Sequence, residues 1–279
     1  MSVDSLIISK ASGEKVVFDS QKLLHSLKSA GASDEISERI LAHILDGLEE
    51  GATTGKIYQE AFRLLKKFSR PSAPKYKLKR AVMELGPSGY PFEKYIGEIL
   101  KKQGYETKVG IVMDGKCVTH EVDVLASKPG EKMAIECKFG NHNGKKVDIK
   151  VALYVHARFQ DLRNHWRRED SEQNVKFRGG IFTNGNFTSD ATKYGTCVGL
   201  KMVSWSFPRN GNLNQMILHS RLFPVTSLTF ITKKEKDFLL KEGIVLVNEL
   251  ANHTEFLDQL RIPRNRIRKA LDEVETLCE

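Results

Sequence analysis

The sequence predicts an α/β protein in which a strand-rich central part lies between two mainly helical parts. A hairpin pattern with alternating apolar positions occupies residues 122–139, and amphipathic helical patterns precede and follow it. Both ends of the chain instead show helix caps and apolar residues at helical spacing. At 279 residues the chain is long enough for two or three domains that each bury a core.

The N-terminal part is predicted to begin with a hairpin and to continue with four helices. Residues 6–8 and 16–18 are short apolar runs around a turn that contains Gly13. Asp, Ser and Thr are favoured N-caps, and Pro suits a first helical turn. The helices are expected to begin near Asp19, Ser33, Thr53 or Thr54, and Pro71 to Pro74, and the last three to end near Gly51, Phe68 and Leu85.

The central hairpin carries a concentrated group of charges. Its turn contains Pro129 and Gly130. Because side chains alternate along a strand, Glu136 and Lys138 share one face, and Asp123 can lie across from them on the neighbouring strand. Two carboxylates a few Å apart raise each other's pKa unless a cation is present. The pattern therefore predicts a divalent metal on Asp123 and Glu136, with Lys138 beside it to meet an anionic substrate.

Helical patterns flank this hairpin in the sequence. Residues 92–104 have apolar side chains at helical spacing, with Pro91 in the first turn and Gly104 at the end. Residues 148–168 form a second predicted helix with four arginines largely off its apolar stripe. From about Pro224 the pattern changes to short helices, predicted over residues 233–242, 245–253 and 255–260, and to a last helix that follows a basic run at 264–269.

Composition limits the class of protein. The formal net charge is +9, which favours a polyanionic partner through counterion release but also suits a solubilising surface. The sequence shows no long apolar run and no signal peptide, so no membrane partner is expected. The four cysteines form no CxxC pair, which is typical of a reduced, cytoplasmic protein without structural zinc or disulfides.

The ordered set Phe92-Glu93, Asp123, Glu136-Cys137-Lys138 and Gly180–Asn184 resembles the Mrr-like restriction endonucleases of the PD-(D/E)xK superfamily over about residues 90–205. One departure is Val122, where the superfamily motif has Pro. The resemblance implies a restriction-endonuclease-like mixed sheet flanked by helices. It implies a DNA endonuclease with one or two Mg²⁺ ions on Asp123 and Glu136 and double-stranded DNA as partner. It assigns catalytic roles to Glu93, Asp123, Glu136 and Lys138.

Residues 5–86 are similar to the ATP-cone domain, a nucleotide-sensing module, through Ile8-Ser9-Lys10, Phe18-Asp19 with Lys22, and Gly51–Thr54. The resemblance implies ATP or dATP as a regulatory ligand, with Lys10 and Lys22 on its phosphates and Thr54 as a polar contact. Ala11 stands where the cone has Arg, which leaves nucleotide binding open. The alternative interpretation of these residues is a small helical domain for DNA binding or dimerisation. Residues 51–56 are similar to a P-loop, but the glycine spacing differs and Ile57 stands where Ser or Thr is needed, so ATP hydrolysis is not predicted.

These patterns predict three domains: an ATP-cone at 1–86, a nuclease domain at 87–222 and a helical domain at 223–279. The last resembles a helix-hairpin-helix unit, with residues 262–265 in place of its glycine-containing hairpin. The leading expectation is a Mg²⁺-dependent, restriction-like DNA endonuclease regulated by ATP or dATP. Cutting both strands needs two active sites, which makes a homodimer plausible. Two alternatives stay open: a nucleotide-responsive DNA-binding regulator without cleavage, and a structure-selective nuclease of junctions or repair.

Overall fold

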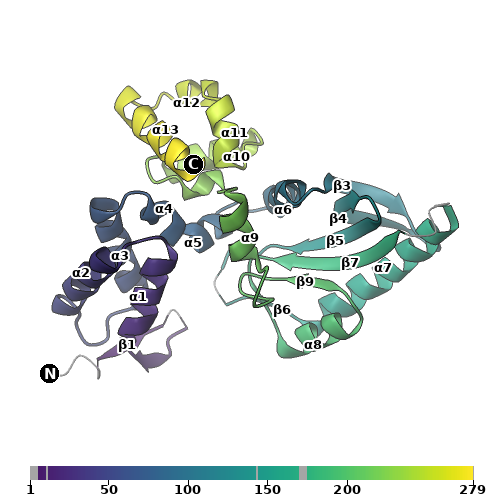
Figure 1. The fold of residues 1–279 in the computed structure, drawn as a ribbon, viewed down its shortest axis with the longest axis horizontal. Helices are drawn as coiled ribbons and strands as arrows, with labels where there is room; N and C mark the ends of the chain where they lie inside the picture. Colours follow the sequence, from purple (N-terminus) through teal and green to yellow (C-terminus); the bar gives the residue numbers. More distant parts are fainter. Residues whose placement is uncertain (1–5, 11, 143, 170–174, 279) are drawn as a thin grey trace. The chain divides into compact units, whose positions relative to one another are not determined.

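The computed structural model describes residues 6–10, 12–142, 144–169 and 175–278. The chain divides into two compact units, residues 1–78 and residues 79–279. Figure 1 shows the helices and strands of each. The dividing point lies at the start of helix α5 (Leu78–Met83), and the three predicted domain ranges stay predictions.

The first unit is a short hairpin followed by helices. Strand β1 (Ile7–Ser9) pairs antiparallel with β2 (Lys15–Val17). Helices α1 (Ser20–Ser29), α2 (Asp34–Asp46) and α3 (Thr54–Phe68) follow. The predicted caps are confirmed, because Asp19, Ser33 and Thr53 each accept a hydrogen bond from a first-turn backbone N–H. The helices bury an apolar core that includes Leu27, Ile40, Ala61 and Leu65.

Two predicted helix boundaries in this region were wrong. Helix α2 ends at a cap on Gly47, whereas Gly51 donates its N–H to the carbonyl of Ile7 at 2.8 Å and so belongs with the hairpin. The single helix expected from Pro71 to Leu85 is two helices, α4 (Ser72–Tyr76) and α5. Pro74 lies in the first turn of α4, where its missing N–H is tolerated, and α4 ends at a cap on Lys77, whose N–H donates to the carbonyl of Ala73 at 3.1 Å.

The second unit is built on a five-stranded mixed sheet with the order β3-β4-β5-β7-β9. The strands β3 (Glu106–Asp114), β4 (Thr119–Lys128) and β5 (Glu131–Lys138) are antiparallel neighbours. Strand β7 (Lys176–Thr183) runs parallel to β5, and β9 (Lys201–Val203) runs parallel to β7. A separate small ladder pairs β6 (Lys146–Val147) in parallel with β8 (Asn186–Phe187). The hairpin predicted at residues 122–139 is confirmed, with longer strands than expected.

Helices α6 (Tyr90–Lys102) and α7 (Ile149–Glu169) cover opposite faces of this sheet (Figure 1). Phe92 of α6 packs on Phe139 at the end of β5, with ring centroids 5.6 Å apart. On the other face α7 buries Phe159, Leu162 and Trp166 against the strands. Alternation along β5 explains this division, since successive side chains meet different helices. Helix α8 (Ser189–Cys197) lies beside α7, and α9 (Leu213–Ser220) follows β9.

The C-terminal helices belong to the same unit. They are α10 (Lys233–Lys241), α11 (Val247–Asn252), α12 (Glu255–Gln259) and α13 (Arg264–Cys278), preceded by a 3₁₀ turn at Val225–Ser227. Three polar contacts join them to α5 and α6. Thr226 donates to the carbonyl of Ala81, Tyr95 donates to the carbonyl of Leu222, and Lys94 pairs with Glu249.

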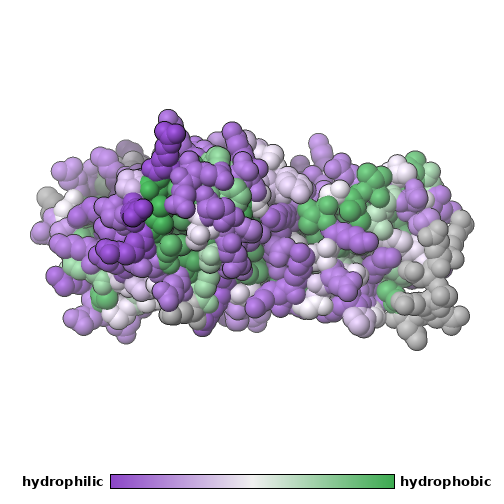
Figure 2. All heavy atoms as spheres, turned by 90° about the horizontal axis from the view of Figure 1, so that it is seen from above, coloured by the Kyte–Doolittle hydropathy of each residue, from purple (hydrophilic) through white to green (hydrophobic). Residues whose placement is uncertain are grey.

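The fold class predicted from the sequence is confirmed: the protein is α/β, with a five-stranded mixed sheet between flanking helices. In the view of Figure 2, hydrophilic side chains cover most of the surface, and apolar side chains gather in patches between them. Within the described residues, every helix is too short or too polar to cross a membrane.

Candidate active site

Asp123 lies where strands β4 and β5 separate. Their ladder ends at the pair Val124 and Ile135, so Asp123 and Glu136 follow just beyond the last paired residues. The Asp123 Oδ2 atom accepts a hydrogen bond from the backbone N–H of Cys137 at 2.7 Å. The carboxylate thus takes the place of a backbone acceptor on the neighbouring strand, and its position is set by the sheet itself.

Glu136 is buried, with 6% of its surface exposed, and its carboxylate is surrounded by donors. Its Oε1 atom lies 2.5 Å from Lys138 Nζ and accepts a hydrogen bond from the Tyr154 hydroxyl. Its Oε2 atom lies 2.5 Å from Arg158 Nη1. Because isolated buried charges are costly, two cations and a hydroxyl allow this carboxylate to stay ionised inside the protein.

Lys138 shares the face of β5 with Glu136, as the alternation predicted. Burial lowers the pKa of Lys138, but its hydrogen bonds with Glu136 and Tyr154 outweigh this effect and leave the pKa above its ordinary value. Its side chain is 38% exposed, and Nζ lies 5.5 Å from the centre of the Tyr154 ring. Lys138 is therefore a fixed positive charge that solvent and substrate can still reach.

Glu93 lies in the first turn of α6, on the predicted helix. Burial, followed by the charges of Asp123 and Glu121, raises the pKa of Glu93 to about 7. Burial and the charge of Glu136 raise the pKa of Asp123 to about 6. These carboxylates therefore act on one another electrostatically. The structure brings the side chains of the four predicted catalytic residues, Glu93, Asp123, Glu136 and Lys138, into one neighbourhood.

The donor chemistry of this neighbourhood suits a hard divalent cation. Asp123 and Glu136 offer carboxylate oxygens, the ligand type that Mg²⁺ prefers. Burial first and the charge of Glu136 second raise the pKa of Asp123, and a bound cation would offset both effects. Glu136 meets this need here through Lys138 and Arg158. Among the described residues, no three His, Cys, Asp or Glu side chains converge as a ready-made metal site. Asp123 and Glu136 are thus a two-carboxylate set that water and substrate oxygens would complete.

Sequence reasoning missed the roles of two α7 residues. Tyr154 lies on the predicted helix over residues 148–168, and its hydroxyl reaches Glu136. Arg158, one of the four arginines of this helix, binds Glu136 and the carbonyl of Glu121, the latter at 3.1 Å. Both residues lie one helical turn apart on the same face of α7. The spacing of these two residues could be predicted from the sequence, but the strand that this face of α7 contacts could not.

The Thr-Asn pair at the end of β7 has a definite structural role. Asn184 is 2% exposed, and its amide holds both the N–H and the carbonyl of Gly140 at 2.8 Å. Thr183 is the register partner of Lys138 across the parallel ladder. Asn184 therefore fixes the chain just beyond Lys138, which keeps the lysine at the end of β5.

The three predicted nucleotide contacts in the first unit line one cavity of about 280 Å³. Lys10 follows strand β1, Lys22 lies in the first turn of α1, and Thr54 is the first residue of α3. Lys10 pairs with Glu14 at 3.0 Å and Lys22 with Asp19 at 3.1 Å, both at the surface. Ala11 lies outside the described residues. The cavity gathers the predicted residues but does not by itself identify an ATP-cone.

The basic run near the C-terminus is partly engaged within the protein. Arg266 donates to the carbonyl of Phe230 and pairs with Glu235 at 2.6 Å. These contacts join α13 to α10 and its N-terminal loop. Arg266 therefore has a packing role, whatever the remaining basic side chains of the run contact.

Comparison with known protein families divides the second unit into two parts. Residues 86–204 match the catalytic domain of the Mrr family, described as a restriction endonuclease. Residues 223–278 match the family described as AF1548-like, C-terminal. The first match contains all four candidate catalytic residues.

A curated protein of Archaeoglobus fulgidus, described as uncharacterised, is 34% identical over 160 residues, which cover 56% of this chain and 84% of the relative. The crystal structure titled protein of unknown function AF1548 is 30% identical, with a TM-score of 0.55, and covers 68% of this chain and 98% of its own. The MspJI restriction endonuclease in complex with a 27-mer oligonucleotide is 14% identical, with a TM-score of 0.27 over 67% of this chain and 44% of its own, a similarity too low to establish a relationship. The chain therefore belongs to the family of AF1548-like proteins, and it contains one region that matches restriction endonucleases and one that matches the AF1548-like C-terminal family.

Proposed function

We propose that this protein is a Mg²⁺-dependent endonuclease that hydrolyses phosphodiester bonds in double-stranded DNA. One observation carries the proposal: two carboxylates and a protonated lysine meet at the separating ends of β4 and β5, within the region that matches the restriction endonuclease family. A surface ion pair would not need the burial and the additional partners of Glu136.

Asp123 and Glu136 are the residues that would hold the metal. When bound, Mg²⁺ supplies a water of lowered pKa and offsets the charge that develops on the phosphate. Asp123 is held in place by the backbone of Cys137, so it needs little reorganisation to act as a ligand. Glu136 is held by side chains alone, and a bound ion could replace Arg158 or Lys138 as the positive charge beside its carboxylate.

Lys138 keeps its proton at Nζ because its pKa lies above the ordinary value. It is therefore proposed to orient the scissile phosphate or the attacking water as a positive charge, and not to act as a base. Glu93 has the complementary property. With a pKa of about 7 it can accept a proton from water near neutral pH, which is the range in which a general base is most effective.

We further propose that the first unit binds ATP or dATP and regulates cleavage. The proposal is supported by Lys10, Lys22 and Thr54 on one cavity, beside the Tyr58 ring, which stacks on Tyr76 at 5.0 Å. Isothermal titration with ATP checks it, using Lys22→Gln as the test variant and exposed Lys67→Gln, at the far end of α3, as the matched control. Equal affinity in the two variants would rule out this assignment.

Plasmid cleavage tests the catalytic proposal. Supercoiled plasmid is incubated with Mg²⁺ or EDTA, with and without ATP, and with native protein, Glu136→Ala and the control Glu106→Ala, which alters an exposed carboxylate of β3. We expect Glu136→Ala to lose about 10²–10³-fold in rate, the scale of removing one transition-state-stabilising group. Cutting by Glu136→Ala at the native rate would refute the proposal. DNA retention in EDTA without cutting in Mg²⁺ would favour the non-cleaving regulator.

A further inference from the structure

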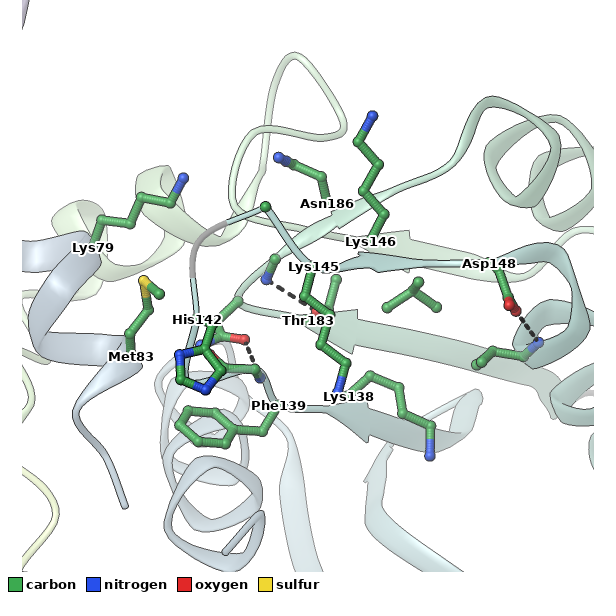
Figure 3. Close-up of a pocket in the computed structure, with 16 residues that line it drawn as sticks. Lys79, Met83, Lys138, Phe139, His142, Lys145, Lys146, Asp148, Thr183 and Asn186 are labelled. Atoms are coloured by element: carbon green, nitrogen blue, oxygen red, sulfur yellow. Dashed lines mark hydrogen bonds between the residues drawn. The ribbon is translucent and has the colours of Figure 1, made fainter. Parts of the chain in front are cut away.

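A cavity of about 290 Å³ opens beside the candidate active site, and Lys138 lines it. Figure 3 shows its lining. The residues come from α5, from the end of β5 and the loop after it, from the start of α7 and from the end of β7. None of the lining residues except Lys138 takes part in the cleavage chemistry proposed above.

Fixed backbone elements build the walls of this cavity. Asn184 holds Gly140 by two hydrogen bonds, and the parallel ladder of β6 with β8 fixes the opposite side. Gly185 leaves no room for change, because an added Cβ there would lie 2.7 Å from the carbonyl oxygen of Lys145. The cavity is thus a formed part of the fold and not a gap between surface side chains.

The charges around the cavity are unequal. Among the described residues, Lys79, Lys138, Lys145 and Lys146 line it together with one carboxylate, Asp148, and Lys138 also pairs with Glu136. The Oδ1 atom of Asp148 accepts a hydrogen bond from the N–H of Val151 at 3.3 Å and so faces the first turn of α7. In Figure 3 the side chain of Lys145 extends toward the end of β5 that carries Lys138. The rim therefore favours an anion next to the candidate catalytic lysine.

The rest of the lining is mixed. His142, Thr183, Asn184 and Asn186 are polar, and Met83, Phe139, Val147 and Val151 form an apolar part that includes the Phe139 ring. A flat group can stack on such an aromatic surface. Bases that have left the nucleic-acid stack do this in proteins that bind displaced or single-stranded nucleotides. The volume lies near the lower end of the range for small-molecule pockets, about 300–1,000 Å³, which suits one nucleotide and excludes a duplex.

We propose that this cavity is a subsite for one nucleotide of the DNA strand, adjacent to the scissile phosphate. Its phosphate meets Lys145, whose side chain extends toward the end of β5 (Figure 3), and its base leaves the stack and rests against Phe139 and Met83. The inference rests on the proposed function, because Lys138 connects the cavity to the cleavage site. It assigns to this chain a substrate in which one nucleotide beside the cut is displaced from the duplex.

Competition binding in EDTA tests this subsite without any need for cleavage. A fluorescent oligonucleotide bound to the full-length protein is displaced by thymidine 5′-monophosphate, by thymidine or by inorganic phosphate, and anisotropy is recorded. The test variant is Lys145→Gln. The matched control is Lys193→Gln, which removes an exposed lysine that does not line the cavity.

We expect the monophosphate to displace the oligonucleotide from native and control proteins. In the test variant it should do so about tenfold less well, since a charge-assisted contact is lost. Thymidine and phosphate alone should compete weakly. Equal competition in test and control variants would overturn the subsite, as would phosphate competing as well as the monophosphate. If the monophosphate binds in dialysis without displacing the strand, the cavity serves a free nucleotide and the strand subsite is refuted. If the monophosphate competes as expected but the protein never cuts DNA, the proposed function is refuted and the subsite is not.

Discussion

Replacing Arg158 by Met tests how the buried charge of Glu136 is maintained. Both Lys138 and Arg158 approach the Glu136 carboxylate to 2.5 Å. Removing one partner of a buried ion pair costs about 3–5 kcal/mol, and a hydrogen bond to a charged group contributes about 1.5–3 kcal/mol. The Arg158 side chain is 28% exposed and Lys138 remains in place, so the lower range applies. We expect Arg158→Met to lower the free energy of unfolding by about 2 kcal/mol.

Urea unfolding followed by tryptophan fluorescence measures this change in the relevant unit, because the chain's two tryptophans, Trp166 and Trp205, both lie in residues 79–279. A double-mutant cycle with Glu136→Gln isolates the pair, and we expect a coupling of about 1 kcal/mol or more in EDTA. Mg²⁺ should reduce the cost of Arg158→Met, since the ion replaces the lost charge. If the two substitutions add to within about 0.3–0.5 kcal/mol, Arg158 does not hold Glu136 and the reasoning is refuted.

Two further predictions follow from the site. Because the pKa values of Glu93 and Asp123 are raised to about 7 and about 6, folding favours their protonated forms, and metal-free stability should fall as pH rises from about 4 through 7. Mg²⁺ should raise Tm at pH 8 more than at pH 5, and equal shifts would contradict this. Asn184→Ala leaves the half-buried backbone groups of Gly140 without this partner and should cost about 1–2 kcal/mol and slow cleavage, measured by urea unfolding and plasmid cutting. The exposed Asn164→Ala should change neither.

Local chemistry made much of the fold predictable. The caps at Asp19, Ser33 and Thr53 depend only on a side chain and the next helical turn, and all were expected. The two faces of β5 follow from alternation, which separates Glu136 from its apolar neighbours. The candidate catalytic residues could be named because strand alternation and the family resemblance pointed to the same positions.

The parts that could not be predicted depend on contacts between distant segments. The approach of Arg158 to Glu136 follows from the packing of α7 on the sheet, which no local pattern reports. The clamp of Asn184 on Gly140 joins residues 44 positions apart. The helix ends near Gly47 and Lys77 were also missed, since each depends on how the flanking chain is hydrogen-bonded.

Helix α6 has a second attachment besides the sheet. Next to Glu93, Lys94 bonds the carbonyl of Gly243 at 2.5 Å and pairs with Glu249 at 3.1 Å, and Tyr95 binds Leu222. The AF1548-like region thus contacts the first turn of α6, which carries Glu93. The position of Glu93 in the proposed cleavage site therefore depends on the packing of these C-terminal residues as well as on the sheet.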